Sequence, residues 1–232
     1  MQDIYRDDPW MDFPVTEAIA EPAAVPGLCA KAIANVAPLD AQLGISPKKT
    51  VPDALWDALF GQPEPQAVEI ADLPRLQTFA ILDAAKVTHL PELLEDSGLE
   101  HRCLFKGSAY DALKNVSPWI VRLEDDNSFT RNLFTCGEAY WHLWGSLPGF
   151  YVRSHESLHD MWRHFRKFTR VEDNEGRGFY LRFWDRSVLN AARRGSSDTA
   201  LYHALIGDMR IIWHSPEPDA PHRVWQLSRA AA

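Results

Sequence analysis

The chain has 232 residues, of which 46% are hydrophobic and nine are tryptophan, so it can bury the core of a sizeable folded domain. Its formal net charge of −8 at pH 7 repels nucleic-acid phosphates and anionic lipid headgroups, and we therefore expect neither nucleic acid nor a membrane as a partner. The sequence shows no signal peptide and no run approaching the ~20 apolar residues that span a bilayer. These features predict a cytoplasmic protein.

Three cysteines, Cys29, Cys103 and Cys136, lie far apart in the sequence. They form no CxxC pair, so they indicate neither a zinc knuckle nor a redox dithiol. Scattered, odd-numbered thiols are typical of a reducing compartment, which agrees with a cytoplasmic location.

The first part of the chain is rich in proline, since ten of the sixteen prolines lie at or before Pro74. Proline removes a backbone donor and disfavours helix in the residue before it. We therefore predict that residues 1–75 form a loosely organised arm with one or two short helices. The apolar spacing in residues 52–60 predicts one of these helices.

From residue 76 the pattern becomes regular, and short apolar runs alternate with helical spacing. The predicted strands are residues 78–82, 101–105, 119–123, 149–152 and 209–213. The predicted helices are residues 90–96, 109–115, a helix capped by Ser128, a helix from Ser154 to Phe168, and residues 186–194 and 198–206. Residues 170–173 and 179–184 flank a glycine-containing connection and predict a hairpin.

This alternation predicts an α/β fold, with α+β as the alternative, in which helices flank a β-sheet. Because a hairpin is present, we expect the sheet to be mixed rather than wholly parallel. The predicted organisation is a proline-rich arm at 1–75, an α/β domain at 76–214 and a C-terminal extension at 215–232.

The segment His155-Glu156-Ser157-Leu158-His159 matches the HExxH pattern of zinc peptidases. If Ser154 caps the helix, His155 falls in its first turn, where the helix dipole repels a cation. The helical wheel also places Arg166 between the two histidines, and the sequence offers no convincing third ligand. We therefore expect no metal, no cofactor and no catalytic residue.

Several blocks of residues, in order, resemble the adaptor or chaperone domain of type VI secretion effectors, a family long catalogued as a domain of unknown function. The blocks are residues 79–85, 94–98, 103–107, 116–123, 144–145, 157–158, 163–166 and 182–189. Within the HExxH segment, Ser157 and Leu158 carry the resemblance, whereas His155 and His159 occupy positions that vary in the family. Mild departures are Ser117, Trp184 and Ser187, and residues 1–75 lie outside the resemblance.

The resemblance implies a non-enzymatic adaptor that binds a cognate toxin effector and promotes its loading on the valine–glycine repeat spike protein, VgrG. It implies no catalytic residues. Capture would use an apolar surface with a polar rim, through strand addition to a sheet edge or a helix laid in a groove. The candidate partner-binding residues are Trp141, Trp144, Arg182, Trp184, Asp185 and Arg186.

Simpler interpretations of these residues remain open. An aromatic cluster such as the one from Trp141 to Trp144 is more often core than interface, and Phe183 and Trp184 are compatible with burial in or against the sheet. Arg182 and Asp185 are compatible with pairing to each other or with capping the next helix. Two alternative functions also remain: a zinc-dependent hydrolase that uses the HExxH at 155–159, and an immunity protein that blocks a toxin's active site.

Overall fold

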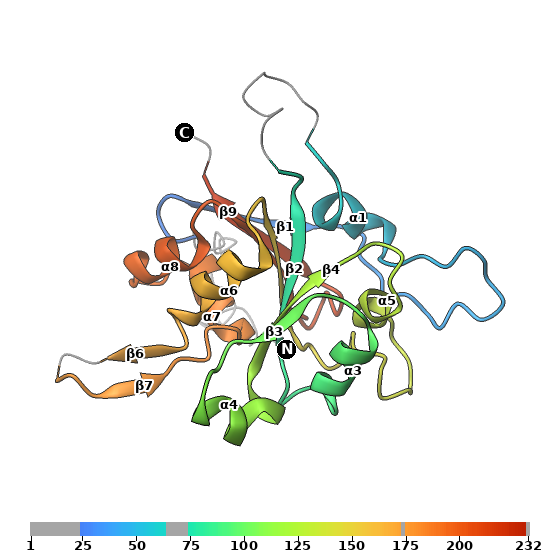
Figure 1. Ribbon diagram of the computed structural model, residues 1–232. Coiled ribbons are helices and arrows are strands. Elements are labelled where there is room, and N and C mark those ends of the chain that lie inside the picture. Colours follow the sequence, from blue (N-terminus) through green and yellow to red (C-terminus); the bar gives the residue numbers. More distant parts are fainter. Residues whose placement is uncertain (1–23, 64–73, 173–174, 231–232) are drawn as a thin grey trace, which may run out of the picture.

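A seven-stranded sheet forms the centre of the computed structural model, which describes residues 24–63, 74–172 and 175–230 (Figure 1). The strand order is β1-β9-β8-β5-β2-β4-β3, and every pairing between neighbouring strands of this sheet is antiparallel. The strands are β1 (Leu28–Ile33), β2 (Gln77–Asp83), β3 (His101–Cys103), β4 (Pro118–Leu123), β5 (Gly149–Ser154), β8 (Arg210–His214) and β9 (Val224–Arg229).

Helices cover both faces of this sheet (Figure 1). The helices are α1 (Asp53–Leu59), α3 (Leu90–Asp96), α4 (Ser108–Leu113), α5 (Ser128–Phe134), α6 (Leu158–Arg166), α7 (Arg186–Arg193) and α8 (Thr199–Ile206), with a short 3-10 turn at Lys114–Val116. Apolar side chains of α6, α7 and α8 belong to one buried cluster, and those of α1, α3 and α5 belong to a second.

The central strand β2 shows why two clusters form. Successive side chains of a strand point to opposite faces of the sheet. Phe79 and Ile81 accordingly join the cluster with α6, α7 and α8, whereas Ala80 and Leu82 join the cluster with α1, α3 and α5. All four are fully buried, which explains why this strand is a continuous apolar run in the sequence.

The structure confirms the predicted α/β class, with helices flanking one sheet. The sheet differs from the expected mixed one because its strands pair antiparallel throughout. The predicted hairpin is present as β6 (Arg170–Glu172) and β7 (Gly178–Tyr180), but it forms a two-stranded sheet of its own. Among the helices of the described residues, none combines the length and apolar character that crossing a bilayer requires.

Two strands of the sheet, β1 and β9, come from outside residues 76–214. β1 pairs with β9 along its whole length, from Leu28 opposite Arg229 to Ile33 opposite Val224. The helix predicted within residues 52–60 is α1, and its Leu55 and Leu59 are buried. The boundaries at 75 and 214 stay predictions, but the sheet draws strands from both sides of them.

A buried arginine holds α1 against the sheet. Arg153 of β5 is only 2% exposed, and its guanidinium donates hydrogen bonds to the carbonyl oxygens of Leu59 and Gly61 at the C-terminal end of α1. It also donates to Thr78 Oγ1 at 2.7 Å. Burial, together with the charge of Arg210, lowers the pKa of Arg153 to about 10.

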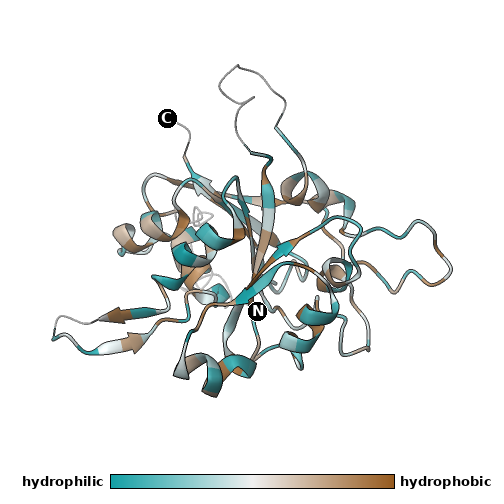
Figure 2. Cartoon of the chain, viewed as in Figure 1, coloured by the Kyte–Doolittle hydropathy of each residue, from teal (hydrophilic) through white to brown (hydrophobic). Residues whose placement is uncertain are grey.

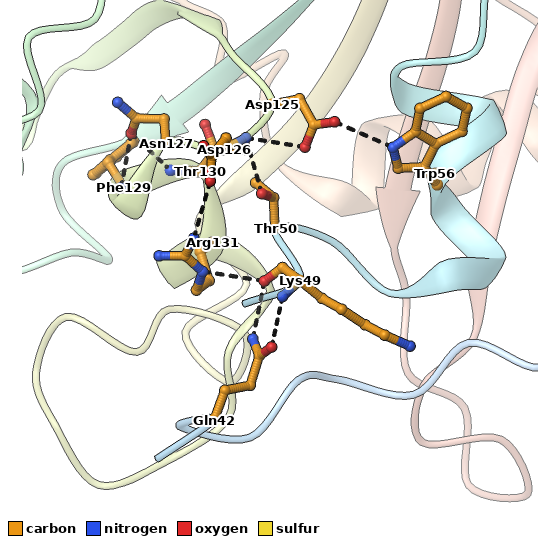
Figure 3. A network of polar contacts seen from close by, with 10 residues as sticks. All are labelled: Gln42, Lys49, Thr50, Trp56, Asp125, Asp126, Asn127, Phe129, Thr130 and Arg131. Carbon is orange, nitrogen blue, oxygen red and sulfur yellow. Dashed lines mark hydrogen bonds and ion pairs between the residues drawn. The ribbon is translucent and has the colours of Figure 1, made fainter. Parts of the chain in front are cut away.

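A network of polar contacts attaches the segment before α1 to α5 (Figure 3). Gln42 and Lys49 exchange two hydrogen bonds, with Gln42 Nε2 donating to the Lys49 carbonyl at 2.9 Å and Lys49 N donating to Gln42 Oε1 at 2.7 Å. Arg131 Nε donates to the same Lys49 carbonyl at 3.1 Å. The Asp126 amide donates to Thr50 Oγ1 at 2.9 Å, so the segment is attached to the body at the adjacent residues Lys49 and Thr50.

Two predicted helix caps are wrong, and each is displaced along the chain. α5 is capped by Asn127, whose Oδ1 accepts hydrogen bonds from the amides of Phe129 and Thr130, rather than by Ser128. Ser154 is the last residue of β5, where it pairs with Gln77. The cap of α6 is Ser157, whose Oγ accepts from the Asp160 amide at 3.2 Å.

We predict that Arg153→Ala lowers the free energy of unfolding by about 3 kcal/mol, because it leaves the Leu59 and Gly61 carbonyls without their charged donor. Urea unfolding followed by circular dichroism measures this loss. Arg210→Ala is the matched control, since it removes a neighbouring cation that opposes the Arg153 charge. Its stability should stay within about 0.5 kcal/mol of the wild type. Equal stability of the two variants would contradict a structural role for Arg153.

Candidate interaction surface

The segment between β7 and α7 is anchored by an ion pair. Arg182 Nη2 lies 2.5 Å from Asp83 Oδ2, and the Asp83 side chain is only 1% exposed. Asp83 also accepts a hydrogen bond from the Ala85 amide at 3.0 Å. Arg182 therefore pairs with the end of β2 rather than with Asp185, the partner considered from the sequence alone.

Asp185 caps α7, as one interpretation of the sequence proposed. Its Oδ1 accepts hydrogen bonds from Ser187 N at 2.9 Å and Ser187 Oγ at 2.8 Å, and its Oδ2 lies 3.6 Å from Lys86 Nζ. Partial burial acts to raise the pKa of this carboxyl, but the Ser187 hydrogen bonds and the charges of Lys86 and Arg182 hold it below its usual value. The ionised carboxylate thus stabilises the start of α7.

The two aromatic residues between Arg182 and Asp185 are buried. Phe183 is fully buried and stacks on Phe165 of α6, with ring centroids 5.6 Å apart and an interplanar angle of 5°. Trp184 is 4% exposed and contacts Phe183 edge-on, with a centroid distance of 5.2 Å. Trp184 therefore contributes to the core beside α6, and a partner does not reach its ring in this conformation.

Trp144 is also part of the core. It is 4% exposed, and its ring stacks on His214 at a centroid distance of 4.1 Å. Trp144 Nε1 donates a hydrogen bond to His222 Nδ1 at 3.3 Å. The Trp144 side chain consequently joins the chain before β5 to the segment between β8 and β9.

The structure brings the neighbours of these aromatic residues together around one open groove of about 830 Å³. Ser146 and Leu147 line it from the segment after Trp144, and Asp185 and Arg186 line it from the start of α7. Cations outnumber carboxylates along this groove, since Lys86 and Arg194 line it as well. Two candidate regions that are far apart in the sequence thus share one polar, cationic groove.

Trp141 lies apart from this arrangement. It is 42% exposed and contacts Tyr140 edge-on, with ring centroids 4.8 Å apart. It is not among the residues that line the groove. Of the six candidate residues, Trp141, Arg182 and Arg186 are exposed, Asp185 is half-buried, and Trp144 and Trp184 are buried. Their role in partner binding stays a prediction.

The HExxH residues do not share a helix face, because α6 begins at Leu158, after His155 and Glu156. His155 Nδ1 lies 2.5 Å from the carbonyl oxygen of Pro74, whereas His159 Nδ1 lies 3.4 Å from Arg102 Nη1. The two histidines therefore have different neighbours. Within residues 24–63, 74–172 and 175–230, no three His, Cys, Asp or Glu side chains gather closely enough to hold a metal ion.

The β6–β7 hairpin carries exposed aromatic residues that the sequence interpretation did not single out. It extends from the body, and Figure 2 shows hydrophobic colour on both of its strands. Phe179 is 50% exposed and Tyr180 is 64% exposed, although the Tyr180 ring contacts Phe105 at a centroid distance of 5.5 Å. The signal available in the sequence was the pair of adjacent aromatic residues directly after the glycine-containing connection of the predicted hairpin.

A family model described as "Domain of unknown function (DUF4123)" matches residues 78–201, which is more than half of the chain. The match runs from β2 into α8, and it includes Asp83, Arg182 and the β6–β7 hairpin. It leaves β1, α1, β8 and β9 outside. Neither the curated proteins nor the solved structures give a match to the chain.

We predict that the buried His214 makes stability depend on pH. Burial, together with the charges of His222 and Arg186, lowers the pKa of His214 from 6.5 to about 4. Between these two values the unfolded chain binds more protons than the folded one, so stability falls as the pH decreases from about 6.5 towards 4. His214→Phe keeps a ring against Trp144 and removes this titration. Melting temperatures measured from pH 7.5 down to 4.5 should fall less steeply for the variant, and parallel curves would contradict the assignment.

Proposed function

Because this chain belongs to the DUF4123 family through residues 78–201, we propose that it is an adaptor of type VI secretion that binds a cognate toxin effector and loads it onto the VgrG spike protein. The proposal rests on the family match taken together with the ordered sequence blocks that resemble effector adaptors. We propose further that the protein is not an enzyme and that it acts in the cytoplasm. Its proposed partners are proteins, and it binds neither nucleic acid nor a membrane.

The observation that carries the proposal is that family-like blocks distant in the sequence meet in the fold. The block at residues 79–85 contains the end of β2, and the block at residues 182–189 contains the start of α7. The ion pair between Asp83 and Arg182 joins them directly. Blocks that resemble a family in sequence order, and that also support one another in space, favour a shared structural role over a chance resemblance.

The β6–β7 hairpin supports partner binding by this protein. Exposed aromatic residues beside polar ones are the usual composition of protein interfaces, where aromatic side chains contribute most of the binding free energy. Phe179 and Tyr180 lie within the matched residues, and the nearby Arg177 and Glu175 are paired with each other at 3.1 Å. We propose that this hairpin contributes apolar contacts to the effector, in place of the buried rings of Trp144 and Trp184.

The experiment is co-expression of the chain with each candidate toxin from the genes that flank its own, followed by affinity purification. We expect the toxin to copurify at a fixed ratio, and deletion of the gene to abolish delivery of that toxin in a bacterial competition assay. A double variant, Phe179→Ser with Tyr180→Ser, should weaken the complex by about tenfold or more, since each lost aromatic contact costs about 1–2 kcal/mol.

Val116→Ser is the control variant, because Val116 is also half exposed, at 53%, but lies away from the hairpin in the turn before β4. It should bind the toxin as the wild type does. The proposal fails if the wild-type chain never associates with the toxin or the spike protein. The proposal also fails if expression of the chain protects cells from the toxin while deletion of its gene leaves toxin delivery unchanged, which is the behaviour of an immunity protein.

A further inference from the structure

We propose that the free edge of β1 is the docking site for an extended segment of the effector, which adds to the sheet as an eighth strand next to β1. This inference rests on the proposed function and names the surface that would perform it. A seven-stranded sheet has two edges, and β1 and β3 occupy them. The two edges differ in length, since β1 has six residues and β3 has three, and in how their outward backbone groups are bonded.

The register of β1 identifies which backbone groups face outward. Ala230 N donates to the Gly27 carbonyl oxygen at 2.9 Å, so these opposite residues form a hydrogen-bonded pair. In an antiparallel ladder the bonded positions alternate, and Cys29, Lys31 and Ile33 therefore face β9 with their amide groups. The amide and carbonyl groups of the intervening residues, Ala30 and Ala32, point away from β9.

These outward groups have no partner among the residues that the structure describes. No other described strand lies beside β1, and no described hydrogen bond uses the amides or carbonyls of Ala30 and Ala32 on that side. Ala30 and Ala32 are successive outward-facing residues, and together they present two donors and two acceptors at the spacing that an added strand requires. An edge of this length is normally covered or blunted in a protein that works alone.

The opposite edge of the sheet is shorter and partly occupied. β3 has only three residues, and the Leu104 amide donates to the Pro118 carbonyl of β4, so the neighbouring backbone groups of Cys103 face outward. The outward Cys103 carbonyl accepts a hydrogen bond from Trp162 Nε1 of α6 at 2.7 Å. A further strand at β3 would have to displace this bond, whereas the outward groups of β1 carry no such contact among the described residues.

The side chains of β1 allow a strand to approach and indicate its chemistry. Cys29 and Ala32 are small and exposed, and Ala30 is small and half-buried. Lys31 is the one charged residue of the strand, and no carboxylate in the described residues pairs with it. The complementary occupant is a strand of alternating apolar residues with an acidic residue opposite Lys31.

The position of β1 relative to the matched residues also favours an effector segment as the occupant. Both β1 and its neighbour β9 lie outside residues 78–201. A surface that selects one particular cargo belongs in a part of the chain that the family model does not describe. A strand added there would bury the edge without disturbing the ion pair between Asp83 and Arg182.

The decisive variant is Ala32→Pro, tested as the full chain co-expressed with the toxin that the wild-type chain captures. Proline at residue 32 removes an outward amide that β9 does not use, so the fold should persist with an unchanged circular dichroism spectrum. We expect the affinity for the toxin to fall at least about tenfold. Ala32→Thr keeps the amide and is the matched control, which should bind as the wild type does.

Native cysteines provide a second readout that does not depend on the proline variant. Cys29 in β1 and Cys136 after α5 are both exposed. Alkylation by N-ethylmaleimide, followed by mass spectrometry, should be slower at Cys29 in the complex than in the free chain, while Cys136 reacts at the same rate in both. Slower reaction at Cys29 would thus report an occupied edge even if Ala32→Pro failed to fold.

The outcomes separate this inference from the proposed function. If the wild-type chain captures no toxin, the adaptor function itself is wrong. If toxin binds and Ala32→Pro binds equally, or if Cys29 is not protected in the complex, the adaptor function stands and strand addition at β1 is wrong. If Cys29 is protected in the absence of toxin and the chain elutes as a dimer, a second copy occupies the edge and the inference is overturned.

Discussion

The buried guanidinium of Arg153 is the contact on which the arrangement of the rest depends. It lies on β5, in the middle of the sheet, and its hydrogen bonds reach the last carbonyls of α1. A helix end carries partial negative charge on its free carbonyl groups, so a cation there satisfies the backbone and the dipole together. Through this contact α1 covers one face of the sheet, although α1 and the matched residues 78–201 are separate in the sequence.

Local sequence patterns were sufficient to predict those helices and strands whose ends are set by their own residues. The apolar run at residues 78–82 predicted β2 because that strand is buried on both faces, and the predicted helix at residues 90–96 has the same bounds as α3. Gly98, with a φ of +68°, supplies the left-handed conformation that follows a helix end. The α/β class followed from the alternation of such elements, and it required no knowledge of their pairing.

Local patterns were insufficient where distant contacts decide the outcome. Ser154 and Ser157 both precede the apolar pattern of α6, and the pairing of Ser154 with Gln77 of β2 is what assigns Ser154 to a strand. Trp144 and Trp184 were attractive as binding residues because tryptophan is common at interfaces, but it is equally suited to a core. Their burial depends on His214 and Phe183, whereas Trp141 and the hairpin residues Phe179 and Tyr180 remain exposed.

The pairing of β1 with β9 sets an order of events during synthesis. β1 has no other described neighbour in the sheet, and the residues of β9 are translated long after it. A nascent chain on the ribosome therefore cannot complete this edge until β9 has emerged, because the sequence separation makes the pairing one of the last to form. A protein that binds the completed edge would consequently not bind nascent chains that lack β9. Formation of the edge therefore marks that β9 has been synthesised.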